Sequence, residues 1–276
     1  MKKNKWLYLL LVPGIALILV FLFIPIINII IPTFYGKTGI SFDKYVEFFK
    51  DEYYVSIFKR TLKIALITSV ITMVLGIPVA YFISRSNKNI RGALIACTVF
   101  PLLTNSVVRS FAWMTILGKN GIINTFLMNV GLIKEPYKLL YTESAIIVGT
   151  VYLFLPLMVV SLVGVMENIE NDLLEAAESL GASRIKAFFK VVFPLSIPGI
   201  IVGSVLVFTG SLTAYTTPQL LGGNRNMVLS TLIYQKTMTL GDWNSASVVA
   251  AIMSITTVTI IFVINKLASR LNERGV

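Results

Sequence analysis

The chain has 276 residues, of which 56% are hydrophobic and only 13% are charged. Soluble domains carry about 25% charged residues, so this composition excludes an ordinary soluble protein and predicts a membrane protein. The net charge is +11, but the basic residues are spread over the loops, which argues against a nucleic-acid-binding protein. With no histidine and a single cysteine, Cys97, the chain nearly excludes zinc, haem and iron–sulfur sites.

The first apolar run covers residues 6 to 31 and follows the basic residues Lys2, Lys3 and Lys5. A signal peptide begins in the same way, but this run is too long and no small-residue cleavage pattern follows it. The sequence therefore predicts an uncleaved first span with its N-terminus in the cytoplasm.

A polar and aromatic stretch, residues 32 to 60, precedes a second apolar run at residues 61 to 84. Aromatic residues mixed with lysines are typical of a membrane interface. Gly76 and Pro78 indicate a bend or a close helix approach within the second span. Arg85, Lys88 and Arg91 then form a short basic turn, predicted to face the cytoplasm.

The third predicted span begins near Gly92, passes Pro101 and ends before a turn at residues 118 to 124. Asn105, Arg109 and Trp113 lie toward its far end. An arginine at membrane depth is costly and is by default a candidate functional residue. The alternative is that Arg109 reaches the interface or pairs with backbone carbonyls, and both interpretations remain open.

The fourth predicted span, residues 144 to 165, leads into a polar element at about residues 167 to 196. Apolar residues at helical spacing, with Asp172 near the start, predict a first amphipathic helix. Gly181 can adopt the left-handed conformation that closes it, and Ser183 can cap a second, basic helix that Pro194 ends. An element of this kind between spans is a candidate docking surface.

The fifth predicted span covers residues 198 to 217, and the sixth covers residues 245 to 267 after a loop at residues 222 to 242. Hydroxyl groups interrupt the end of the fifth span. Such groups either bond back to their own helix and bridge helices, or line a pathway. The candidates are Ser211, Thr213, Tyr215 and Thr216.

The polar element resembles the EAA loop of ABC-importer permeases, whose pattern is E-A-A, three residues, G, nine residues, I, one residue, L-P. The matching residues are Glu175, Ala176, Ala177, Gly181 and Pro194, while Val191 and Phe193 replace the usual isoleucine and leucine. The resemblance implies a coupling helix that inserts into a groove of a separate ATPase, with Glu175 offering its carboxylate and Gly181 and Ser183 shaping the bend.

Two further stretches, residues 101 to 124 and 215 to 223, resemble permeases of spermidine/putrescine-type importers. Their shared features are a proline, an arginine, an aromatic–tryptophan pair and G-x-x-N in the first, and an aromatic residue, T-P and L-x-G-G in the second. The resemblance implies transport of polyamines, with ferric ion, thiamine, opines or phosphonates as alternative solutes. An arginine would repel a polyamine, so Arg109 is not expected to bind one directly.

Together these features predict an all-α, polytopic membrane protein of about six transmembrane helices, with a single domain at residues 1–276 and the type I ABC importer permease fold. The resemblance implies two ATP-binding cassette subunits that hold ATP and Mg, a second and different permease chain, and an external substrate-binding protein. The chain itself is expected to bind no cofactor, metal or nucleic acid and to have no catalytic residue. A stand-alone secondary transporter is the rival, but the predicted spans lack the acidic residues that such proteins often use.

The expected location is the bacterial cytoplasmic (inner) membrane, with both termini in the cytoplasm. The 24 basic residues divide equally between the two sides, but the cytoplasmic segments are shorter and so have the higher density of positive charge. Their basic residues are Lys2, Lys3, Lys5, Arg85, Lys88, Arg91, Arg184, Lys186, Lys190, Lys266, Arg270 and Arg274.

Overall fold

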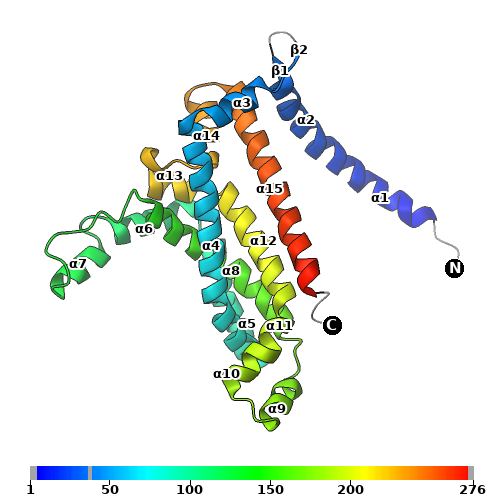
Figure 1. The fold of residues 1–276 in the computed structure, drawn as a ribbon, viewed down its shortest axis with the longest axis vertical. Coiled ribbons are helices and arrows are strands. Elements are labelled where there is room, and N and C mark those ends of the chain that lie inside the picture. Colours follow the sequence, from blue (N-terminus) through cyan, green and yellow to red (C-terminus); the bar gives the residue numbers. More distant parts are fainter. Residues whose placement is uncertain (1–4, 37–38, 273–276) are drawn as a thin grey trace. The chain divides into compact units, whose positions relative to one another are not determined.

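The computed structural model describes residues 5–36 and 39–272, which are almost entirely helical (Figure 1). They form two units: Met1–Val55 with Leu232–Ser254, and Ser56–Thr231 with Ile255–Val276. The expectations for Lys2, Lys3 and Arg274 lie outside the described residues. The helices after the first unit's N-terminal elements are α4 Glu52–Ser84, α5 Lys88–Leu103, α6 Ser106–Leu117, α7 Ile122–Asn129, α8 Glu143–Met166, α9 Asn171–Ser179, α10 Arg184–Ala187, α11 Phe193–Leu195, α12 Ile197–Thr213, α13 Thr216–Gly222, α14 Leu229–Tyr234 and α15 Trp243–Asn272.

The first unit begins with the predicted first span. Helix α1 (Lys5–Ile18), a π-helical segment (Leu19–Phe23) and α2 (Ile24–Ile30) follow one another directly and end in a 3₁₀ turn, Ile31–Phe34. A short hairpin, β1 Tyr35–Gly36 and β2 Gly39–Ile40, and helix α3, Asp43–Lys50, come next. The aromatic residues of the predicted interface stretch pack together here, because the rings of Phe34, Phe42 and Tyr45 lie 5.3 to 6.4 Å apart.

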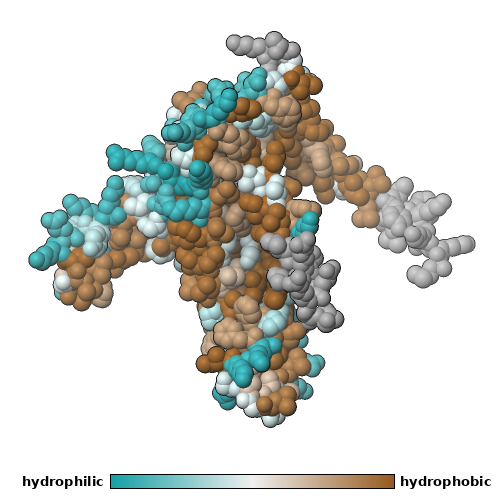
Figure 2. Space-filling model, in the orientation of Figure 1, coloured by the Kyte–Doolittle hydropathy of each residue, from teal (hydrophilic) through white to brown (hydrophobic). Residues whose placement is uncertain are grey.

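Four helical stretches of the described chain are long and apolar enough to cross a membrane. Two further pairs of helices qualify together but are bent, by 92° and 65°, so the total is six if each pair is one span. Figure 2 shows hydrophobic side chains gathered along α2 and along the middle of α4. The four spans are Leu11–Phe34, Glu52–Ser84, Glu143–Met166 and Trp243–Lys266, and the bent pairs are Lys88–Leu103 with Ser106–Asn129 and Arg184–Leu195 with Ile197–Thr213.

Helix α8 is central to the second unit, where it packs against α5, α12 and α13. Small residues let α12 approach it closely. A Cβ atom on Gly203 would lie 2.6 Å from the Met158 sulfur, and one on Gly210 would lie 2.5 Å from the Phe154 ring. Close contact between backbones is how membrane helices associate without a hydrophobic driving force. The core around α8 consists of buried apolar side chains, and Met158, Leu162 and Met166 are fully buried in it.

The structure differs from the predicted elements at four places. The third span is not one helix, since α5 and α6 meet at a 92° break around Thr104 and Asn105. The fifth ends at Thr213 rather than at residue 217, and α13 follows as a separate helix. The expected loop at residues 222 to 242 contains α14 and a π-helical segment, and α7 was not predicted at all. The two breaks within spans fall at short polar stretches, residues 104–106 and 215–217, and these are too short to interrupt the hydropathy averaged over the length of a span.

Candidate functional site

The EAA element, residues 167 to 196, lies at one end of α4 and α8 (Figure 1). Helix α9 ends at Ser179 with Leu180 as its C-cap, and Gly181 has φ +85°, the left-handed conformation predicted for this position. Ser183 then caps α10, with its hydroxyl oxygen accepting a hydrogen bond from the Lys186 backbone N–H at 3.4 Å. The predicted glycine pivot and serine cap are therefore both present.

Asp172 lies in the first turn of α9, as its position near the start predicts, although the N-cap residue is Glu170 and its side chain does not cap the helix. The second helix runs from Arg184 through a π-helical segment to Leu195, so it ends one residue after Pro194, close to the predicted stop. The chain bends by 65° after Leu195 and continues as α12.

The outer surface of the EAA element is apolar and uncovered. Leu180 is 90% exposed and Ile185 is 73% exposed, while Glu175 and Ala176 are also exposed and Ala177 is half-buried. Exposed apolar side chains rimmed by charges mark an interaction surface. The matching residues Glu175, Ala176 and Ala177 thus lie where a partner protein can reach them.

Two arginines hold the start of the EAA element against the turn between α4 and α5. Arg85 donates from Nη1 to the Ile169 carbonyl at 2.8 Å and to Asn171 Oδ1 at 2.6 Å. Arg91 pairs with Glu167 through Nη1 and donates from Nη2 to the Ser84 carbonyl at 3.0 Å. The sequence alone indicates only basic residues that flank the spans, because nothing in it pairs the two arginines with residues about 80 positions away.

Arg109 stabilises the break between α5 and α6, here called the elbow. Its side chain is buried and donates from Nη1 to the Pro101 carbonyl at 2.7 Å and to the Thr104 carbonyl at 3.3 Å. These are carbonyls that the end of a helix leaves without partners. Asn105 caps α6 by accepting hydrogen bonds from Val107 and Val108 N–H. The carbonyl-pairing interpretation of Arg109 is therefore the one that its contacts show.

A cavity of about 210 Å³, the elbow cavity, lies between the elbow and the break that separates α12 from α13. Of the candidate pathway residues, four line it: Arg109, Thr213, Tyr215 and Thr216. Three do not. Asn105 caps α6, the Trp113 ring packs edge-on against Tyr152 at 5.6 Å, and Ser211 is buried in α12. No carboxylate is among the residues that line the elbow cavity.

The G-x-x-N pattern at residues 121 to 124 has a structural explanation. Asn124 is fully buried, donates to the Gly118 and Tyr137 carbonyls at 3.1 and 2.9 Å, and accepts from Tyr137 N–H at 3.0 Å. A Cβ atom on Gly121 would lie 2.4 Å from the Ile116 carbonyl oxygen. These residues fasten the turn from α6 to α7 and are not part of the elbow cavity.

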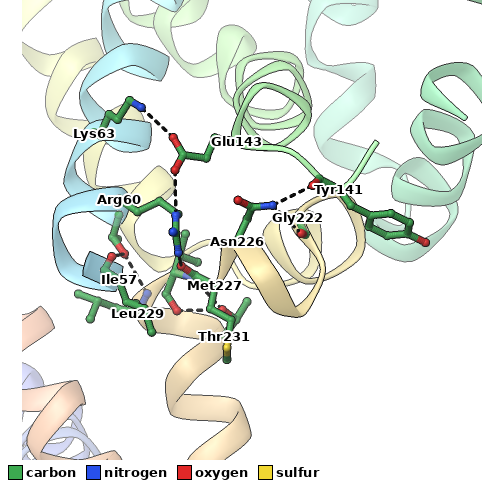
Figure 3. A network of polar contacts seen from close by, with 12 residues as sticks. Ile57, Arg60, Lys63, Tyr141, Glu143, Gly222, Asn226, Met227, Leu229 and Thr231 are labelled. Carbon is green, nitrogen blue, oxygen red and sulfur yellow. Dashed lines mark hydrogen bonds and ion pairs between the residues drawn. The ribbon is translucent and has the colours of Figure 1, made fainter. Parts of the chain in front are cut away.

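An ionic network fastens the other end of α4 and α8 (Figure 3). Glu143 accepts hydrogen bonds from Arg60 Nε at 2.9 Å and Lys63 Nζ at 2.8 Å, and Arg60 Nη1 donates to the Met227 carbonyl at 3.1 Å. Asn226 donates to the Tyr141 carbonyl at 2.8 Å. The segment between α13 and α14 is thereby tied to α4 and to the residues just before α8.

We expect Glu143→Gln to destabilise the protein by about 1–3 kcal/mol, since Arg60 would lose its charged partner in a largely buried position. The melting temperature of the purified protein in detergent measures this loss. Glu135→Gln, which neutralises an exposed acid, is the matched control. Equal melting temperatures for the two variants would show that the network contributes nothing.

The first unit contains its own cavity of about 380 Å³, lined by residues that include Lys44, Glu47, Asp51, Tyr54 and Lys236. A hydrogen bond with Tyr54 is the main cause that raises the pKa of Lys236, whose ammonium also lies 3.7 Å from Asp242. Hydrogen bonds with Ser245 lower the pKa of Asp242. Two lysines and two acids line this cavity, so it has no excess of either charge.

The helical spans, the central breaks and the exposed polar element between two spans define a membrane transport permease. Residues 66–274 match the family described as "Binding-protein-dependent transport system inner membrane component", and the chain belongs to this family. It is thus a multi-pass inner-membrane permease subunit of an ABC importer, which works with a substrate-binding protein and an ATPase.

Individual relatives support the same class. The chain is 32% identical over 247 residues to the spermidine/putrescine transport system permease protein PotB of Salmonella typhimurium (strain SL1344), covering 87% of this chain and 86% of that protein. It is 34% identical over 233 residues to PotB of Escherichia coli (strain K12), covering 82% and 84%. A chain of a bacterial alginate ABC transporter, solved with an alginate-bound periplasmic protein, has the same fold, with a TM-score of 0.82 at 22% identity over 98% of this chain and 96% of that one.

Proposed function

We propose that this chain forms half of the translocation pathway of a polyamine importer, carrying spermidine or putrescine. The observation that supports this substrate is the identity of 32% and 34%, over more than 80% of both chains, to permeases named for these two polyamines. The other half of the pathway is a second, different permease chain. The EAA end of the bundle and both termini face the cytoplasm in this arrangement.

The EAA element is the contact with the ATPase. Two ATP-binding cassette subunits, holding ATP and Mg, supply the energy, and this chain hydrolyses nothing itself. Leu180 and Ile185 offer exposed apolar side chains for a groove on the ATPase, and Glu175 offers a carboxylate to an arginine or to backbone donors there. The positive φ of Gly181 sets the angle between α9 and α10.

The selection of a polyamine does not come from the elbow cavity. A polycation is recognised by carboxylates and aromatic faces. The cavity has two aromatic residues, Phe154 and Tyr215, but no carboxylate, and the Arg109 guanidinium would repel a polycation. Recognition therefore belongs to the external binding protein or to the partner permease.

Arg109 and the hydroxyl groups favour a second candidate function, transport of an anionic solute such as a phosphonate or an opine.

Uptake of radiolabelled putrescine and spermidine tests the substrate. Cells lacking the gene for this chain should lose uptake and regain it when the gene is restored, and unlabelled phosphonate or opine should not compete. Normal polyamine uptake in the deletion strain, with loss of uptake of another solute, would overturn the polyamine proposal while leaving the class of transporter in place.

A further inference from the structure

We propose that Arg85 and Arg91 are positioning residues that clamp the EAA element to α5, so that α5 carries its movement to the elbow. The inference rests on the proposed function, because it takes the EAA element as the contact with the ATPase. It adds the mechanical connection between that contact and the elbow cavity.

The clamp joins three elements at one point. Its acceptors on the EAA element, Glu167, the Ile169 carbonyl and Asn171, all lie at or just before the first residue of α9. Arg91 belongs to the first turn of α5 and also donates to the Ser84 and Ser86 carbonyls, at 3.0 and 3.1 Å, where α4 ends. A displacement of α9 therefore acts directly on the start of α5.

Burial and aromatic packing strengthen the clamp. The side chain of Arg91 is 20% exposed and that of Glu167 is 45% exposed, so solvent screens the pair mainly on the Glu167 side. The Arg85 guanidinium lies over the Tyr81 ring at 5.7 Å, and this ring packs edge-on against Phe188 of the EAA element at 5.0 Å. The contact thus combines charge, hydrogen bonds and ring packing on both halves of the EAA element.

The route through the clamp is stiffer than the route along the chain. From α9 to α12 the chain passes the Gly181 pivot, a four-residue helix, a π-helical segment and a 65° bend. From Arg91 to the elbow the chain forms a single helix, α5. Its residues Leu94 and Ile95 pack against the buried core around α8. At the far end Arg109 holds the elbow, and its guanidinium lines the elbow cavity.

Some hydrogen-bond donors of the clamp have no acceptor. Among the described residues, Nε and Nη2 of Arg85 and Nε of Arg91 are buried without a hydrogen-bond partner. Buried donors normally have partners, and unpaired ones call for an explanation. Spare donors allow the two guanidinium groups to take new acceptors as α9 moves, so the clamp can hold the element in more than one position.

The test uses the complete transporter, with its ATPase, partner permease and binding protein, reconstituted in liposomes. The variants are Arg91→Glu, Glu167→Arg and the double exchange, with Lys88→Glu as a control for an exposed lysine on the same turn. Three quantities are measured for each: the amount of ATPase that co-purifies, ATP hydrolysis, and uptake per ATP hydrolysed.

We expect Arg91→Glu to retain the ATPase and its hydrolysis while uptake per ATP falls about tenfold or more, because the variant replaces the ion pair with Glu167 by two like charges and loses the hydrogen bonds to the Ser84 and Ser86 carbonyls. The double exchange should restore much of the uptake, because it re-forms the ion pair with its charges reversed. Uptake per ATP hydrolysed separates coupling from a structural loss, because misfolded transporter loses uptake and hydrolysis together. Normal coupling in Arg91→Glu, or no recovery in the double exchange, would overturn the clamp. Failure of the unaltered chain to retain an ATPase would instead overturn the proposed function.

Discussion

A Gly181→Asp variant is expected to reach the membrane and lose most of its uptake. Gly181 has φ +85°, where a side chain costs about 1–2 kcal/mol, although a Cβ atom there would meet no other atom within 4 Å. The strain therefore acts on the angle between α9 and α10 rather than on packing. ATP hydrolysis by the complex should continue while uptake falls.

Ser179→Asp is the matched control, because it adds the same charge to the exposed surface of α9 at an ordinary helical position. Uptake and ATP hydrolysis are measured together in reconstituted liposomes. Equal losses in the two variants would attribute the effect to charge and not to the pivot.

Glu175→Lys should also separate hydrolysis from uptake, since it reverses the charge offered to the ATPase. Normal transport by both Glu175→Lys and Gly181→Asp would refute the assignment of the EAA element as the contact with the ATPase.

Arg109→Leu is expected to have the second large effect, a fall in stability of about 2–4 kcal/mol together with loss of uptake. The guanidinium donates to the Pro101 and Thr104 carbonyls at the 92° elbow. Leucine would remove this donor from both carbonyls and leave the Pro101 carbonyl with only the Thr104 hydroxyl. The melting temperature and the uptake kinetics of the same variant should be compared.

Thr213→Val provides the control, because Thr213 lines the same cavity but its hydroxyl bonds only to carbonyls of its own helix. We expect it to keep its melting temperature. A raised KM for the solute with an unchanged melting temperature in Arg109→Leu would contradict the structural role and make Arg109 a ligand of the solute.

The sequence was sufficient to predict features that depend on nearby residues. Long apolar runs fixed the spans, because each must reach about 20 residues to cross a membrane. The left-handed conformation of Gly181 and the helix cap by Ser183 are confirmed, because a helix end is determined by the residues at that end.

Features that depend on distant residues were not predictable. Arg85 and Arg91 gave no sign of their acceptors, which lie 76 to 86 positions away. The elbow is not predictable from Pro101, because a proline is compatible with a continuous, kinked helix. The elbow shows itself only in the structure, where the buried Arg109 side chain donates to the Pro101 carbonyl. Four of the seven candidate pathway residues nevertheless meet at the elbow cavity, since hydroxyl groups and an arginine in apolar helices are few enough to stand out.

The most direct test of the central claim is purification of this chain from its native membrane, followed by identification of what remains bound. We predict that an ATPase and a second permease chain co-purify with it. We further predict that replacing Leu180 and Ile185 by aspartate releases the ATPase but not the permease. An unaltered chain that retains no ATPase would contradict the account.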